Sequence, residues 1–142
     1  MKSVKQLLDS KGSQIYAIGP DALVIDALKL MAEKDVGALV VTESARLAGI
    51  ISERDYARKV ILHGKSSHDI RVREIMTAKV VTVHPGQTVE ECMALMTAKR
   101  IRHLPVTEGE RLVGLLSIGD LVKEVIAEQE ATIKQLESYI HS

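Results

Sequence analysis

The pattern Ser-x-x-Asp occurs twice in the chain, each time directly after a glycine and two aliphatic residues. The first copy, GIISERD, spans residues 49–55, and the second, GLLSIGD, spans residues 114–120. The aliphatic pair indicates the end of a buried strand, and the serine and aspartate indicate the first turn of a helix. A serine hydroxyl beside the free N–H groups of a helix start can bind a phosphate. A carboxylate offers two acceptor oxygens to the vicinal hydroxyls of a sugar, so the two turns predict two sites for a sugar phosphate.

The same spacing also has a structural explanation that needs no ligand. In a capping box, the serine and the acidic residue three positions later satisfy each other's backbone N–H groups. A single occurrence would favour this explanation. The pattern occurs twice, at equivalent places of a repeated unit, so ligand binding and the capping box both remain open at this point.

The elements around the two turns also repeat. Residues 15–61 align with residues 80–126 at a constant shift of 65 without a gap, and 16 of the 47 aligned positions are identical. A gap-free repeat with equal turn lengths indicates a tandem duplication. The apolar patterns predict strands at 15–18, 38–42 and 47–51 with helices at 22–34 and 52–63, then strands at 80–83, 103–107 and 112–116 with helices from Thr88 and Ser117.

Local signals place the ends of some of these elements. Asp21 is a suitable N-cap for the first helix of the repeat, and Thr88 with Glu91 forms a capping-box pattern in the second copy. Ahead of the repeat, residues 4–8 predict a short amphipathic segment that ends in a loop at 9–13.

The last helix is predicted to run from about Gly119 to Ile140, well past the end of the repeat. Its later apolar residues, Ile133, Leu136 and Ile140, are spaced three and four apart, which is typical of a coiled-coil seam. A lone helix with so few apolar positions is marginal in water, so we expect it to pack in a homodimer. A terminal helix that folds back on its own sheet is the alternative.

The composition argues against several classes of partner. The 19 Lys and Arg residues are balanced by 19 Asp and Glu residues, and the basic residues form no long run. This balance disfavours nucleic acid or a membrane as the main partner. No apolar run approaches the roughly 20 residues that span a bilayer, and the N-terminal residues show no signal-peptide pattern. Cys92, the single cysteine, cannot form an internal disulfide, so we expect a cytoplasmic protein.

No pattern in the sequence predicts catalysis. There is no catalytic triad, carboxylate pair or metal signature, and His63 and His68 in a glycine-serine loop are a weak metal candidate. Cys92 lies among apolar residues of a helix and is expected in the core. We therefore expect no enzyme activity and no catalytic cofactor. A small hydrolase or transferase that uses Cys92 and a histidine is the alternative, which thiol blocking with an activity screen would test.

The repeated β-α-β-β-α unit resembles a cystathionine-β-synthase (CBS) domain. The resemblance rests on IRHLPV at 101–106 on the central strand and on Gly-aliphatic-aliphatic-Ser-x-x-Asp after the last strand. Two such units in tandem resemble a Bateman module, and VREIMT at 72–77 matches the segment that precedes a repeat. The implied fold is α/β, with mixed sheets in two pseudo-twofold related repeats. We expect an N-terminal segment and first repeat at 1–71, a second repeat at 72–127 and a helical extension at 128–142.

The resemblance implies two clefts between the repeats that bind adenosine-containing ligands such as AMP, ADP, ATP, S-adenosylmethionine or NAD(H). Asp55 and Asp120 would bind the ribose hydroxyls. Ser52 and Ser117 would bind the phosphate. The implied adenine contacts lie in the backbone around Gly37 and Ala38, and around Arg102, His103 and Leu104, beside Pro105 of the central-strand motif.

The two predicted sites differ in charge. Arg54, Arg58 and Lys59 flank the first Ser-x-x-Asp turn, whereas the second turn has Lys123 and Glu124 at the places of Arg58 and Lys59. We therefore expect the first site to be the better phosphate site. The alternative is that these cations are only the solvated face of a helix.

These observations predict a non-enzymatic regulatory module that senses an adenine nucleotide, AMP, ATP or NAD(H), and acts on a separate effector protein. The alternative is a purely structural dimerisation domain with degenerate clefts. Neither nucleic acid nor a membrane is expected as a partner.

Overall fold

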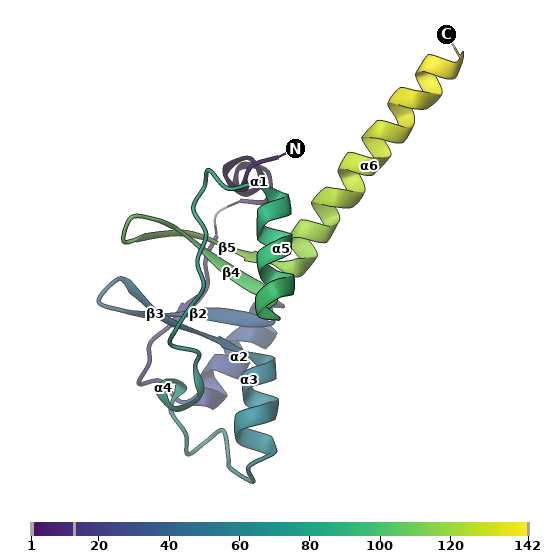
Figure 1. Ribbon diagram of the computed structural model, residues 1–142. Helices are drawn as coiled ribbons and strands as arrows, with labels where there is room; N and C mark the ends of the chain where they lie inside the picture. The colour runs from purple at the N-terminus through teal and green to yellow at the C-terminus, as the bar shows by residue number, and fades with distance from the viewer. Residues whose placement is uncertain (1, 13, 142) are drawn as a thin grey trace.

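The duplication becomes two stacked units of the same design in the computed structural model, which describes residues 2–12 and 14–141 (Figure 1). The predicted mixed α/β fold is confirmed. In chain order the elements are α1 (Val4–Lys11), β1 (Ala17–Ile18), α2 (Val24–Lys34), β2 (Ala38–Glu43), β3 (Arg46–Ser52), α3 (Glu53–Tyr56), the π-helical η1 (Ala57–Ile61), α4 (Val72–Ile75), α5 (Val89–Lys99), β4 (His103–Glu108), β5 (Arg111–Ser117) and α6 (Ile118–His141).

The two hairpins have the same register. In the first unit β2 pairs antiparallel with β3, with Ala38 opposite Ser52, and a bulge follows Val41. In the second unit β4 pairs with β5, with His103 opposite Ser117, and the bulge follows Val106. All of these positions are related by the shift of 65, which confirms the duplication. Each hairpin ends at the serine of a Ser-x-x-Asp turn.

The strand predicted at 80–83 does not form. The first sheet has the order β1-β2-β3, but the second contains only β4 and β5, with a single parallel bridge from Val83 to Val106. In the first unit the Val40 N–H donates to the Tyr16 carbonyl at 3.3 Å. Its counterpart in the second unit is Pro105, which has no N–H to donate, so the ladder cannot extend.

The predicted start of the first repeat helix was also wrong. Asp21 does not cap α2, because Leu23 is extended and pairs with Arg71 as an isolated bridge. The Val24 N–H at the helix start donates to the Ile70 carbonyl at 2.8 Å, and Asp21 instead forms an ion pair with Arg73 at 3.3 Å. A backbone partner from a distant segment thus replaces the local cap.

Other helix ends agree with the predictions in part. Thr88 caps α5 by accepting from the Glu91 N–H at 3.2 Å, but the Glu91 carboxylate accepts from Gln87 instead of returning the bond. Helix α1 continues to Lys11 through the start of the predicted loop and ends at Gly12, where φ is 93°. The loop residue at position 13 lies outside the described residues.

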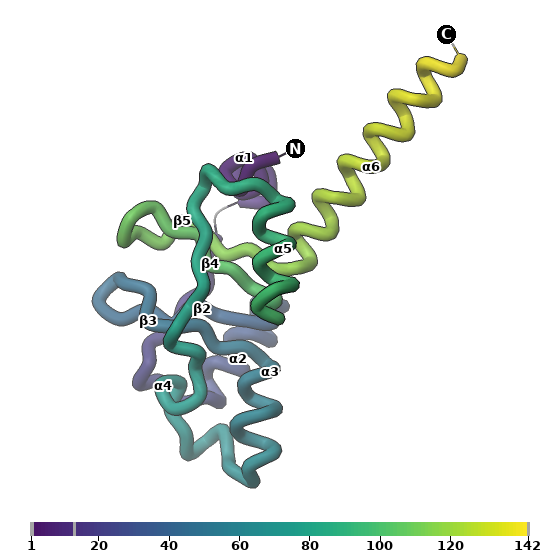
Figure 2. The backbone as a smooth tube through the Cα atoms, in the orientation of Figure 1, coloured from purple at the N-terminus to yellow at the C-terminus, as the bar shows by residue number. Residues whose placement is uncertain are grey.

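Each unit has its own aliphatic core, and each core is completed by a segment that precedes the other repeat. Val4, Leu7 and Leu8 of α1 are buried in the core of the second unit. Val72 and Ile75 of α4, the segment before the second repeat, are buried in the core of the first. The tube in Figure 2 shows α1 beside β5 and α5, far from the repeat that follows it in the chain.

The crossing segments are held by matching backbone contacts. Leu23 pairs with Arg71 in one unit, and Thr88 pairs with Ser3 in the other. Helix α6 leaves the second unit and projects away from both sheets (Figure 1), so it does not fold back on its own sheet. None of the described helices is both long and apolar enough to cross a membrane.

We predict that the glycine shared by the two repeats is more sensitive to substitution in the first. A Cβ at Gly49 would lie 2.7 Å from the Thr77 backbone carbonyl, whereas at Gly114 it would lie 2.7 Å from a methyl group of Leu8. The Leu8 methyl group can rotate away, but the Thr77 carbonyl is held by the bridge between Ile50 and Thr77. Gly49→Ala should therefore lower the free energy of unfolding by roughly 1–3 kcal/mol, and Gly114→Ala should lower it clearly less. Urea denaturation of both variants tests this, and equal or reversed losses of unfolding free energy would contradict it.

Candidate functional site

Two cavities lie between the units, and each is lined by residues of both. The Ser52 cleft, of about 440 Å³, contains the first Ser-x-x-Asp turn, and the Ser117 cleft, of about 400 Å³, contains the second. The Ser52 cleft is lined by Gly37, Ile50, Ser52, Glu53, Arg54, Asp55, Arg58, Lys59, Thr77, Lys79, Val80, Val81, Arg100, Ile101, Arg102 and His103. The Ser117 cleft is lined by Lys11, Gly12, Gln14, Tyr16, Asp35, Val36, Gly37, Ala38, His103, Leu115, Ser117 and Asp120.

Most of the predicted site residues line one of these clefts. Ser52, Arg54, Asp55, Arg58, Lys59 and Arg102 line the Ser52 cleft, Ala38, Ser117 and Asp120 line the Ser117 cleft, and Gly37 and His103 line both. Leu104 is fully buried in the core of the second unit and Pro105 is buried in β4, and neither lines a cleft.

The Ser52 turn is a complete capping box. The Ser52 Oγ accepts from the Asp55 N–H at 3.2 Å, and the Ser52 N–H donates to Asp55 Oδ2 at 3.0 Å. Lys59 approaches the other carboxylate oxygen, Oδ1, at 3.1 Å and also donates to the Ile75 carbonyl at 2.9 Å. The hydrogen bonds of the predicted capping box are therefore present here, and the turn also lines the cavity between the units.

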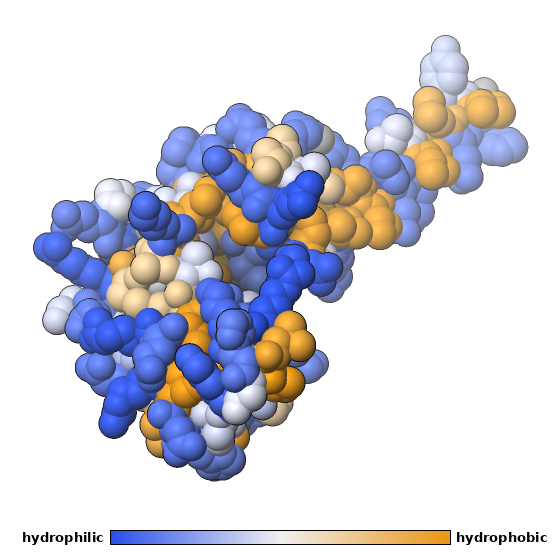
Figure 3. All heavy atoms as spheres, turned by 60° about the horizontal axis from the view of Figure 1, so that its bottom comes forward, coloured by the Kyte–Doolittle hydropathy of each residue, from blue (hydrophilic) through white to orange (hydrophobic). Residues whose placement is uncertain are grey.

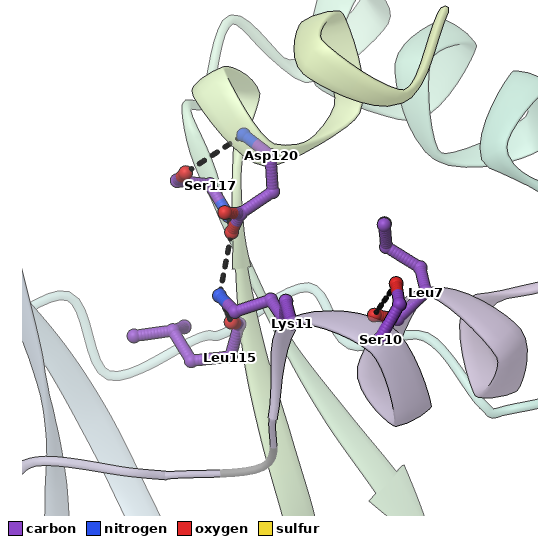
Figure 4. A network of polar contacts seen from close by, with 6 residues as sticks. All are labelled: Leu7, Ser10, Lys11, Leu115, Ser117 and Asp120. Carbon is purple, nitrogen blue, oxygen red and sulfur yellow. Dashed lines mark hydrogen bonds and ion pairs between the residues drawn. The ribbon is translucent and has the colours of Figure 1, made fainter. Parts of the chain in front are cut away.

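The Ser117 turn has the same cap but takes its lysine from elsewhere in the chain. Figure 4 shows Lys11 of α1 pointing at Asp120, with Nζ 2.7 Å from Oδ2 and 3.0 Å from the Leu115 carbonyl oxygen. The Ser117 N–H donates to the same Oδ2 at 2.8 Å. Lys11 thus plays the part that Lys59 plays in the first unit. No local pattern could have found it, because 109 residues separate it from Asp120.

Two side chains of the Ser117 cleft, Asp120 and His103, have shifted pKa values. Burial opposes ionisation of Asp120, but hydrogen bonds from Lys11 and Ser117 outweigh burial and hold the pKa of Asp120 below its usual value. Burial lowers the pKa of His103, with the nearby charges of Arg102 and Lys11 acting in the same direction and Asp120 opposing them. At neutral pH, His103 is therefore uncharged and Asp120 is ionised.

The two clefts differ strongly in charge. The Ser52 cleft is lined by six cationic side chains and two acidic ones, which gives a net charge of +4. The Ser117 cleft is lined by one lysine and two aspartates, which gives −1. The sequence predicted a more cationic first site from Arg54, Arg58 and Lys59. The second unit adds the cationic side chains of Lys79, Arg100 and Arg102 to the lining of the same cleft, and Arg102 had been expected only as a backbone contact.

Cys92 and the potential metal-ligating side chains were the other candidates for chemistry. Cys92 is fully buried, and burial raises the pKa of its thiol to about 11, so the nucleophilic thiolate is scarce at neutral pH. Among the described residues, no group of three or more His, Cys, Asp or Glu side chains is arranged to hold a metal ion.

Two interlocked α/β units of the same design, with two clefts between them, define a tandem pair of small α/β domains. The CBS domain family model matches residues 4–62 and 72–127. The chain therefore belongs to the CBS-domain family and contains two CBS domains in tandem, which confirms the resemblance seen in the sequence.

Known proteins agree with this assignment. The mitochondrial CBS domain-containing protein CBSX3 of Arabidopsis thaliana is 44% identical over 145 residues, which cover 99% of this chain and 69% of that protein. The structure of a CBS-domain protein from Burkholderia ambifaria is 56% identical, with a TM-score of 0.87 over 90% of this chain and 96% of that one. The CBS pair of protein MJ0100, solved with 5′-methylthioadenosine and S-adenosyl-L-methionine, shares the fold with a TM-score of 0.80 at 23% identity, over 90% and 98% of the two chains.

Replacing Lys11 with methionine should raise the pKa of Asp120. The substitution removes the hydrogen bond and the positive charge that now offset the effect of burial on this carboxyl group. A depressed carboxyl pKa adds stability that is present above the unfolded-state value of about 3.9 and is lost as the pH falls through the folded-state value. The stability difference between parent and Lys11→Met should therefore be largest near neutral pH and shrink in acid. Carbon-13 NMR titration of the Asp120 carboxyl group measures the shift.

The control is Lys5→Met, which removes a cation from an exposed position of the same helix. It should leave the Asp120 titration unchanged. An identical Asp120 titration curve in Lys11→Met and the parent would show that the Lys11 contact does not form in solution.

Proposed function

We propose that this chain is a non-enzymatic regulatory module that binds an adenosine-containing nucleotide in the Ser52 cleft. The observation that carries the proposal is the net charge of +4 around a Ser-x-x-Asp turn in a cleft lined by both units. Six cationic side chains in one cavity of about 440 Å³ repel one another, and a polyphosphate relieves that repulsion.

The roles follow from where the side chains lie. Asp55 would accept hydrogen bonds from the ribose hydroxyls, in exchange for part of its contact with Lys59. Ser52 and the cations of both units would bind the phosphates. The adenine would lie towards Gly37 and the neutral His103. The MJ0100 pair, which was solved with two adenosine compounds, supports this class of ligand.

The charge difference supports different ligands in the two clefts. ATP carries more phosphate charge than AMP or NAD(H) and therefore suits the Ser52 cleft better. The Ser117 cleft, at −1, suits an adenosine compound with little or no phosphate. Because each cleft is lined by both units, a bound ligand would favour one relative orientation of the units over others. A separate effector protein would respond to that orientation.

A structural dimerisation domain is the second candidate function. It is favoured by one observation, namely that in both turns the serine and the aspartate satisfy each other's backbone N–H groups. In either case we propose a homodimer. The cytoplasmic location stays a prediction, and the name of the Arabidopsis relative places that protein in mitochondria.

ATP should raise the melting temperature of the parent protein, with a stabilisation of about 2.7 kcal/mol at one hundred times the dissociation constant. Asp55→Asn keeps one acceptor oxygen for the Ser52 cap but removes the second carboxylate oxygen, which would accept from the ribose hydroxyls, so it should weaken ATP binding. Asp120→Asn is the matched control in the other cleft and should leave ATP binding largely intact. Calorimetric titration of the three proteins tests this, and a failure of ATP, AMP and NAD(H) to bind at millimolar concentration would favour the dimerisation domain.

Salt should weaken ATP binding much more than adenosine binding. The phosphates meet the net positive charge of the Ser52 cleft, and that attraction is screened as ionic strength rises. Titrations of Asp120→Asn and of Asp55→Asn with ATP, at several salt concentrations, isolate the Ser52 cleft and the Ser117 cleft in turn, and adenosine is the uncharged reference ligand. Equal salt slopes for the two variants would contradict the proposed division of ligands.

A further inference from the structure

Helix α6 exposes a row of aliphatic side chains after it leaves the second unit. Near its start Leu121 is fully buried in the core, but all residues from 129 to 141 are exposed. Figure 3 shows hydrophobic residues in orange along the projecting helix, with hydrophilic residues beside them. The exposed fractions are 41% at Val122, 50% at Ile126, 54% at Ile133, 58% at Leu136 and 76% at Ile140.

These side chains follow a coiled-coil spacing that begins inside the second repeat. The positions are 122, 126, 129, 133, 136 and 140, with steps of four and three in alternation, and only Gln129 is polar. In heptad terms, the three isoleucines occupy a positions, and Val122, Gln129 and Leu136 occupy d positions. We call this row the α6 seam. A single helix that exposes such a seam to water is marginal without a partner.

We propose that the α6 seam packs antiparallel against the α6 seam of a second copy of this chain. In that arrangement an a position faces a d position, so Ile126 lies opposite the partner's Leu136 and Ile140 lies opposite the partner's Val122. Ile133 lies opposite the partner's Gln129, so neither glutamine faces another glutamine. The seam is covered over its full length by one symmetric contact.

Charge complementarity selects the antiparallel orientation. The e positions that flank the seam are Lys123, Glu130 and Glu137, and in an antiparallel pair e faces e. Lys123 then lies beside the partner's Glu137, and symmetry forms this ion pair twice, against one repulsion between the two Glu130 side chains. Within the described residues, neither Lys123 nor Glu137 has an ion pair in its own chain.

A parallel pair would gain no such contacts. There e faces g, and the g positions are Val125, Thr132 and Tyr139, none of which is charged at neutral pH. A parallel pair would also place Gln129 against the partner's Gln129. The charges flanking the seam therefore favour the antiparallel pair over the parallel pair by two ion pairs less one repulsion.

The first test is a charge exchange in the full chain, measured by sedimentation equilibrium at low salt. Lys123→Glu and Glu137→Lys each replace two attractions with two repulsions, so each should weaken the dimer by about tenfold. The double variant restores opposite charges and should recover the parent dissociation constant. Glu130→Gln removes the central repulsion and should tighten the dimer. Failure of the double variant to recover, or a parent that is monomeric at tens of micromolar, would overturn the proposal.

The second test reports orientation through disulfide formation. Gln129→Cys and Ile133→Cys chains should each fail to cross-link alone, but should form a mixed disulfide when combined, because a disulfide requires close Cβ atoms. A parallel pair would instead cross-link each variant with itself, which would refute the antiparallel arrangement. The parent, with only the buried Cys92, is the control for background oxidation. ATP titration of each variant reports separately on the proposed nucleotide site, which lies outside the seam.

Discussion

The fold depends on the exchange of short segments between the two units. Each hairpin with its helices leaves one side of its core open, and the segment that precedes the other repeat closes it. Val4 and Leu8 do this for the second unit, and Val72 and Ile75 do it for the first. Because neither hydrophobic core is complete without a segment from the other side of the chain, we expect the two units to fold together. The exchange also fixes how the units face one another, and therefore shapes both clefts.

Features that arise within one repeat could be predicted from the sequence. The hairpins, their equal register and the Ser-x-x-Asp turns follow from apolar patterns and turn lengths that occur twice. The predictions failed where a distant segment decides the structure. Leu23 is held by the backbone near Arg71 and not by a cap at Asp21. The strand at 80–83 is lost because Pro105 removes one donor from its partner.

The same limit applies to the candidate site. The cations near the Ser52 turn were visible in the sequence, since they lie on the helix that the turn begins. Lys79 and Arg100 lie on the opposite wall of the cleft, and Lys11 reaches the Ser117 turn from α1. Nothing local indicates these residues, because their positions depend on how the units pack. The two turns thus retain the same cap after duplication, while the charges around them have diverged.

Gly37 and His103 line both clefts, so the two cavities have a wall in common. A ligand that displaces this wall in one cleft changes the space that the other cleft offers. Thermodynamic linkage then requires the effect to be reciprocal: the factor by which the first ligand changes the affinity of the second equals the factor by which the second changes the affinity of the first. A module with this wall would report the concentrations of two metabolites as one combined signal, and neither concentration could be read from it independently.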